Sequence, residues 1–179
     1  MPWRVFPWER AAKSGEPFSS SYVYPNQGSG RFDLRDVPVL YLAETAVHAV
    51  AEKLQRFRGQ RIDRNDLKES GWPLALVECR LTLQKIADLC DPDVLAKHHI
   101  APDSLASRDF TKTQGVSRML YKEGYKGLRW WSALSGDWHT IVLFLDRVSA
   151  EDLEYGKPEQ LTVRHPTVKA ACTALGVRG

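Results

Sequence analysis

The sequence predicts an α+β fold within a single domain that spans residues 1–179. A length of 179 residues fits one domain better than two. A hydrophobic fraction of 43% with 26% charged residues is typical of a folded globule and argues against a disordered chain. The expected elements run strand, helix, and then several strands with two helices among them. Because this order lacks regular β-α-β alternation, it disfavours a doubly wound parallel sheet.

The first elements can be assigned from turn-forming residues and from runs of apolar residues. Residues 1–36 contain many Pro, Gly and Ser, so we expect an irregular, aromatic-rich N-terminal segment. Residues 37–42 (VPVLYL) form an apolar run rich in β formers and predict a strand, with Pro38 near its start, where a strand tolerates proline.

The clearest helix is expected over residues 44–58. Apolar side chains recur there at helical spacing, at Val47, Val50 and Leu54. Several alanines favour the helical conformation, and Gly59 is a plausible stop.

The remaining elements follow a break at residues 71–73. We expect strands at 74–81 and, more weakly, 83–89, a helix to about residue 97 after Asp91-Pro92, a helix at 111–123, strands at 127–131 and 140–145, a last strand at 160–164 and a helix at 167–175. The last two elements belong to a C-terminal strand/helix extension, residues 150–179.

Charge and cysteine usage exclude several classes of protein. A net charge of +3 without a Lys/Arg block disfavours direct nucleic-acid binding. Three cysteines without C-x-x-C spacing disfavour a disulfide framework or a zinc ribbon, and Cys79 and Cys90 are expected to be small core residues. The sequence shows no secretory signal and no apolar run of about 20 residues, so we expect a cytoplasmic protein that does not insert into a membrane.

Familiar catalytic and nucleotide-binding motifs are missing. Residues 28–33 (GSGRFD) begin like G-x-G-x-x-G, but they end in Asp and follow no strand, so they do not predict a Rossmann site. His98 and His99 are adjacent, and on a helix they would point about 100° apart, which disfavours metal binding by this pair.

Four polar residues at the edges of expected elements remain as candidates. Arg31 closes the Gly-rich loop, where it could be solvent-exposed, could cap a backbone carbonyl, or could bind a phosphate or carboxylate as a fixed fork. Tyr41 lies in the first expected strand and could be sheet core, while Ser132 could satisfy local backbone at a strand end. Glu52 lies about 180° from the apolar stripe of its helix, which makes it either a solvated residue that pairs with Arg56 or part of a second, cleft-lining face.

These residues lie in segments that together resemble the RES domain, a family named for an Arg, a Glu and a Ser. The matching segments are 28–33 (GSGRFD), 38–43 (PVLYLA), 46–52 (AVHAVAE), 124–132 (GYKGLRWWS) and 139–144 (HTIVLF). The resemblance covers residues 3–148. The resemblance places the family's Arg, Glu and Ser at Arg31, Glu52 and Ser132, with Ser135 as a competing candidate for the serine, and it adds Tyr41 as a substrate-binding residue.

The resemblance implies an ADP-ribosyltransferase-like fold, with mostly antiparallel sheets and a few flanking helices around a central cleft. It implies a bacterial toxin of the RES/Xre toxin–antitoxin type that cleaves the nicotinamide–ribose bond of NAD+ by hydrolysis or phosphorolysis. NAD+ would be the substrate, with no further cofactor and no metal, and an Xre-type helix-turn-helix antitoxin would be the partner. The alternatives are a mono-ADP-ribosyltransferase that modifies a cellular protein and a non-catalytic protein-binding module.

Within this resemblance the residue types suit the reaction. Cleavage passes through an oxocarbenium-like centre, which a carboxylate stabilises electrostatically, and we assign this role to Glu52. Arg31 would grip the pyrophosphate, Tyr41 would pack on nicotinamide or ribose, and Ser132 would orient the carboxamide or ribose. Glu52 and Arg31 are therefore the predicted catalytic residues.

Overall fold

A computed structural model describes residues 1–25 and 27–178 of the chain. The chain divides into two compact units that interleave along the sequence. The terminal unit contains Met1–Tyr22, Ala43–Arg80 and Glu154–Gly179, and the central unit contains Val23–Leu42 and Leu81–Leu153.

The sheet of the terminal unit is built around its longest strand, β4 (Trp72–Leu81). The strands that pair with β4 are β1 (Trp3–Pro7), β3 (Lys68–Glu69), β8 (Leu153–Tyr155) and β9 (Glu159–Gln160). The pairings with β1, β3 and β9 are antiparallel. The turn between β3 and β4 places Ser70 and Gly71 at φ +52° and +83°, as a tight hairpin requires.

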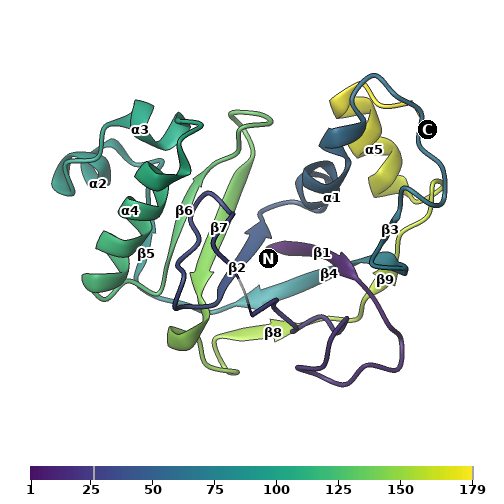
Figure 1. Ribbon diagram of the computed structural model, residues 1–179, viewed down its shortest axis with the longest axis horizontal. Coiled ribbons are helices and arrows are strands. Elements are labelled where there is room, and N and C mark those ends of the chain that lie inside the picture. Colours follow the sequence, from purple (N-terminus) through teal and green to yellow (C-terminus); the bar gives the residue numbers. More distant parts are fainter. Residues whose placement is uncertain (26, 179) are drawn as a thin grey trace. The chain divides into compact units, whose positions relative to one another are not determined.

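Two helices complete the terminal unit. Helix α1 (Ala46–Leu54), which continues into the 3₁₀-helix η1 (Gln55–Phe57), packs against α5 (Pro166–Leu175) and against β1 (Figure 1). The Thr45 side chain caps α1 by accepting a hydrogen bond from the His48 amide at 3.2 Å. Both helices contain small buried side chains, Ala49 and Ala51 on α1 and Ala171 on α5.

The central unit holds a second group of strands, in the order β2-β7-β6-β5. Their bounds are Val39–Ala43 (β2), Ile86–Asp88 (β5), Gly127–Trp131 (β6) and His139–Phe144 (β7). β6 pairs antiparallel with β7 and parallel with β5. The 3₁₀-helix η2 (Leu145–Arg147) follows β7.

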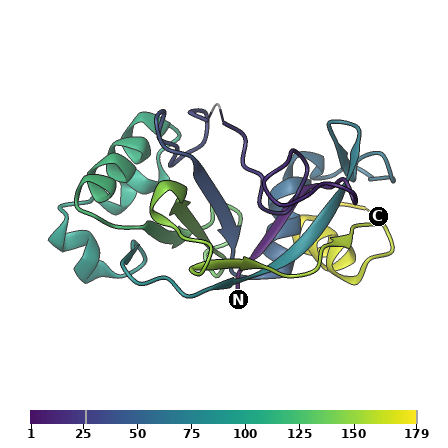
Figure 2. The same ribbon diagram turned by 90° about the horizontal axis from the view of Figure 1, so that it is seen from below.

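Three helices gather beside β5 and β6 in the central unit (Figure 2). They are α2 (Pro92–Lys97), α3 (Pro102–Ala106) and α4 (Phe110–Lys122), and α4 packs on both α3 and β6. Between these helices and the strands lies one apolar core, whose fully buried members include Phe32, Leu89, Leu128 and Phe144. Phe32 lies beside Arg31, so this core fixes the backbone next to the candidate arginine.

The structure confirms the α+β prediction and most expected elements, and it corrects three. The irregular segment over 1–36 is wrong for Trp3–Pro7, because this stretch forms β1 by pairing with β4, more than 65 residues away. The last expected strand, 160–164, shrinks to β9 at Glu159–Gln160, and the weak strand over 83–89 shrinks to β5. Helix α3 was missed because five residues are too few to show a helical period. No helix within the described residues is long and apolar enough to span a membrane.

Candidate functional site

The Gly28–Asp33 loop is organised by the carboxylate of Asp33, which is 6% exposed. Its Oδ2 atom accepts hydrogen bonds from the amides of Gly28 and Gly30 at 2.9 and 2.8 Å, and its Oδ1 atom accepts one from the Tyr41 hydroxyl at 2.8 Å. A Cβ atom at Gly30 would lie 2.5 Å from Asp33 Oδ1 and 2.8 Å from the Tyr41 oxygen. Glycine is therefore required at position 30 for steric reasons.

Helix α4 holds the carbonyl groups of the same loop. Gln114 Nε2 donates to the carbonyls of Gly28 and Gly30 at 3.0 and 2.9 Å. The Thr113 hydroxyl donates to the Arg31 carbonyl, and the Ser117 hydroxyl donates to the Phe32 carbonyl at 2.9 Å. The loop is thus fixed at its amides by Asp33 and at its carbonyls by α4. The bond from Ser117 also gives a partner to the Phe32 carbonyl, which burial would otherwise leave unpaired.

The side chain of Arg31 is held from three directions. Its Nη1 atom donates to the carbonyls of Leu105 and Ser107 at the end of α3, at 3.0 and 2.5 Å. Its Cζ atom lies 4.7 Å from the centre of the Phe110 ring and 5.0 Å from that of Trp130. Burial lowers the pKa of Arg31 from its usual value, but a guanidinium remains protonated at neutral pH.

Two nitrogen atoms of the Arg31 guanidinium donate no hydrogen bond to the described residues. Among residues 1–25 and 27–178, its hydrogen bonds to protein all use Nη1, so Nη2 and Nε are not engaged by the described part of the chain. These two donors form the edge of the guanidinium that can contact two oxygens of a phosphate or carboxylate at once. The bonds from Nη1 match the alternative in which Arg31 caps backbone carbonyls, and the use of Nη2 and Nε as a fork for an anion stays a prediction.

Tyr41 uses its hydroxyl group inside the protein. In addition to donating to Asp33, the hydroxyl oxygen accepts a hydrogen bond from the Phe32 amide at 2.9 Å. Burial raises the pKa of Tyr41 far above its usual value, with a further contribution from the neighbouring Asp33 carboxylate. The half-buried Tyr41 therefore braces the Gly28–Asp33 loop, a role that the sequence does not indicate.

This raised pKa gives a pH-dependent prediction. Above pH 10 the tyrosine of the unfolded chain loses its proton while folded Tyr41 retains it, so the free energy of unfolding should fall as pH rises. Tyr155 and Cys79, whose pKa values burial raises to about 12, contribute in the same direction. In urea titrations between pH 9 and pH 11.5, Tyr41→Phe should lose stability with pH less steeply than the wild type. Equal slopes would contradict the assignment.

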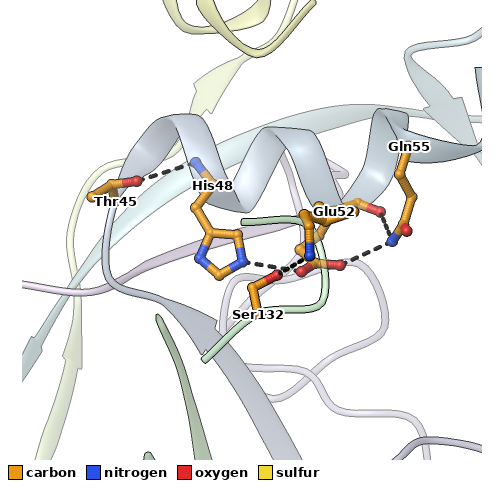
Figure 3. A network of polar contacts seen from close by, with 6 residues as sticks. Thr45, His48, Glu52, Gln55 and Ser132 are labelled. Atoms are coloured by element: carbon orange, nitrogen blue, oxygen red, sulfur yellow. Dashed lines mark hydrogen bonds and ion pairs between the residues drawn. The ribbon is translucent and has the colours of Figure 1, made fainter. Parts of the chain in front are cut away.

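Glu52 lies on α1 with both carboxylate oxygens held by neighbours on the same face (Figure 3). Oε1 is 3.0 Å from His48 Nε2, and Oε2 accepts from Gln55 Nε2 at 2.9 Å. The Glu52 side chain is 40% exposed, whereas that of His48 is fully buried. The expected alternative partner, Arg56, instead places its guanidinium 4.8 Å from the centre of the Phe57 ring.

Ser132 follows β6 directly, as predicted. Its amide donates to the Trp138 carbonyl at 2.6 Å, and its hydroxyl oxygen accepts from the Leu134 amide at 3.1 Å. The competing candidate, Ser135, lies three residues further on and accepts from the Trp138 amide through its carbonyl at 3.1 Å. Ser132 is 3% exposed and Ser135 is half-buried.

In the central unit Tyr41, on β2, contacts the loop that carries Arg31 through its hydroxyl, and Ser132 follows the strand that carries Trp130. Glu52 belongs to the terminal unit. Sequence reasoning missed the residues that fix the Arg31 loop, which are Asp33, Phe110, Thr113, Gln114, Ser117 and Trp130. Thr113 and Ser117 carried a signal, because two polar residues four apart lie on the buried face of α4. Among the described residues, no group of three His, Cys, Asp or Glu side chains could hold a metal ion.

The comparisons with known proteins agree with this fold. A chain in the crystal structure of the M. tuberculosis MbcT–MbcA toxin–antitoxin complex superposes with a TM-score of 0.65 at 20% identity, over 90% of this chain and 83% of that chain. The α+β fold with a mostly antiparallel sheet is thus shared with a protein of a toxin–antitoxin complex. No curated protein matches the sequence. The RES domain matches residues 1–164, and the chain belongs to the RES domain family.

Proposed function

We propose that this protein is the toxin of a toxin–antitoxin system and that it consumes NAD+ by cleaving the nicotinamide–ribose bond. The observation that carries the proposal is the fixed, charged Arg31 fork, presented by a loop that the RES domain match includes. Membership of the RES family and the structural likeness to a chain of a toxin–antitoxin complex support the same reading.

In this proposal Arg31 binds the pyrophosphate of NAD+. Its Nη2 and Nε atoms donate to phosphate oxygens, while Nη1 stays bonded to the carbonyls at the end of α3. Because the protein already orders the guanidinium, binding the dinucleotide costs less side-chain entropy than it would with a freely rotating arginine.

Glu52 supplies the negative charge that the reaction needs. When the bond between the nicotinamide nitrogen and ribose C1 breaks, the electron pair leaves with nicotinamide and positive charge develops on the ribose. A carboxylate whose oxygens are already oriented by His48 and Gln55 stabilises that charge without reorganising. Nicotinamide leaves as a neutral group, so the step requires no general acid. Water or phosphate then adds to C1.

Tyr41 and Ser132 have supporting roles in the proposal. The hydroxyl of Tyr41 braces the Arg31 loop, which leaves its ring as the part that can pack against nicotinamide or ribose. The Ser132 hydroxyl, placed by the turn after β6, orients the carboxamide or a ribose hydroxyl.

An antitoxin completes the proposed system. We propose an Xre-type helix-turn-helix protein that covers the NAD+-binding residues, and cytoplasmic action of the toxin. The support is the family membership together with the likeness to a chain solved in a complex of toxin and antitoxin.

Expression in a bacterial host tests this function. Induction of the wild type should arrest growth and deplete cellular NAD+, and co-expression of a helix-turn-helix protein encoded next to it should prevent both effects. Arg31→Ala, produced at the same soluble level, should leave growth and NAD+ nearly unchanged because the pyrophosphate contact is lost. Normal growth with abundant, soluble wild-type protein would refute the toxin assignment.

A further inference from the structure

Phe110 is a large apolar residue that the fold leaves at the surface, with 36% of it exposed. It is the first residue of α4, whose N-terminus is capped by Asp109 through a 3.0 Å hydrogen bond from the Thr111 amide. The Phe110 ring lies 4.7 Å from the Arg31 guanidinium carbon, closer than Trp130 on the strand β6. The ring therefore contacts the one candidate side chain whose orientation matters for binding an anion.

We propose that Phe110 is a positioning residue, which holds the Arg31 guanidinium in the orientation that contacts the pyrophosphate of the substrate. This inference rests on the proposed function of Arg31 and adds to it the residue that fixes the arginine.

The arrangement of α3 and α4 supports this role. The first turn of α4 touches Arg31 at both ends, because Phe110 contacts the guanidinium and the Thr113 hydroxyl donates to the Arg31 carbonyl. The end of α3 fixes Nη1 through the Leu105 and Ser107 carbonyls. The Asp109 amide donates to the Ser107 hydroxyl at 3.0 Å, so the link between the two helices is itself ordered.

The two aromatic rings beside Arg31, those of Phe110 and Trp130, differ in how deeply they are buried. Trp130 is 6% exposed, packs edge-on against Phe32 at 5.0 Å and belongs to the core, so its loss would disturb the fold. Phe110 is 36% exposed and is not a member of that core, so its replacement should disturb the fold less than the loss of Trp130. A ring over a guanidinium gains cation–π attraction, and it limits the rotation of the guanidinium plane. Phe110 is therefore the one of these two rings that can be substituted with little expected change to the fold.

The test uses two matched substitutions, Phe110→Leu and Phe110→Tyr, in the full chain. Leucine keeps an apolar side chain of similar volume but removes the ring face, whereas tyrosine keeps the ring. For nicotinamide release from NAD+, Phe110→Leu should raise KM about threefold to tenfold and change kcat by less than about twofold, the range expected for loss of one cation–π contact. Phe110→Tyr should resemble the wild type. An unchanged KM in Phe110→Leu would overturn the proposal.

A double-mutant cycle separates positioning from a general structural effect. If Phe110 acts through Arg31, then Phe110→Leu should have no further effect on kcat/KM for the residual nicotinamide release of an Arg31→Ala background, measured at high enzyme concentration. Independent, additive effects would overturn the proposal. Circular dichroism and thermal unfolding establish that each variant is folded.

A binding measurement distinguishes this inference from the proposed function. Calorimetry with inorganic pyrophosphate should give an affinity about threefold to tenfold weaker for Phe110→Leu than for the wild type, whether or not NAD+ is cleaved. A wild type that binds pyrophosphate but leaves NAD+ intact would refute the NAD+ assignment and leave the role of Phe110 standing. Equal affinities, or no binding of pyrophosphate to the wild type, would refute the role of Phe110.

Discussion

Glu52→Gln should reduce the rate of NAD+ cleavage by about 100-fold or more, while the fold persists. Glutamine matches glutamate in shape and can still hydrogen-bond to His48 and Gln55, but it lacks the charge that stabilises the developing cation. Removal of one preorganised electrostatic contact to a transition state costs on the order of 100- to 1,000-fold in kcat. The measurement is the initial rate of nicotinamide release at saturating NAD+.

Glu69→Gln is the matched control for this substitution. Glu69 belongs to the same unit, is similarly accessible at 32% exposed, and also has a partner, since its Oε2 atom lies 2.7 Å from Lys53 Nζ. It has no part in the proposed mechanism, so its variant should retain nearly full activity. Equal rates for Glu52→Gln and the wild type would remove Glu52 from the mechanism.

Asp33→Ala should produce the largest loss of stability among the site variants, about 3 kcal/mol in the free energy of unfolding. The substitution removes the acceptor of the Gly28 and Gly30 amides and of the Tyr41 hydroxyl. A buried donor left unsatisfied costs about 1 to 3 kcal/mol, and the half-buried Gly30 and Tyr41 contribute most of the loss because Gly28 is exposed to water. Because the loop carries Arg31, affinity for NAD+ should fall as well. Urea unfolding and calorimetry measure the two effects.

Asp36→Ala serves as the comparison, three residues further along the chain. Its carboxylate is 65% exposed and pairs on the surface with Arg118, an arrangement that contributes little because water screens it. The Asp36 variant should therefore be almost as stable as the wild type and should bind NAD+ normally. Similar stability of the Asp33 and Asp36 variants would show that the loop does not depend on Asp33.

Local patterns were sufficient for most of the fold. The helical spacing of Val50 and Leu54 identified α1, and the Pro166 and Gly176 boundaries identified α5, where Gly176 adopts φ +68°. β1 was missed because its stability comes from pairing with β4, and a contact over such a sequence distance leaves no local signature.

The sequence supplies candidate residues for the site but not their contacts. Residue type and the family resemblance pointed to Arg31, Tyr41, Glu52 and Ser132. A helical period places His48, four residues before Glu52, on the same side of α1 as Glu52. The His48 side chain is nevertheless fully buried while that of Glu52 is 40% exposed, because burial depends on what packs around the helix. Likewise, no local pattern shows that the carboxylate of Asp33 would accept hydrogen bonds from the amides of Gly28 and Gly30 in the same loop.

The proposed cleavage of NAD+ is tested most directly by mixing a catalytic amount of the purified protein with NAD+ in phosphate buffer. Proton NMR then follows the mixture. We expect free nicotinamide to accumulate in large excess over the protein. The second product would be ADP-ribose if water is the acceptor, or ADP-ribose 1-phosphate if phosphate is. In a parallel reaction with cell extract, ADP-ribose attached to a protein would identify transfer instead. Intact NAD+ in both reactions, with folded wild-type protein, would contradict the account.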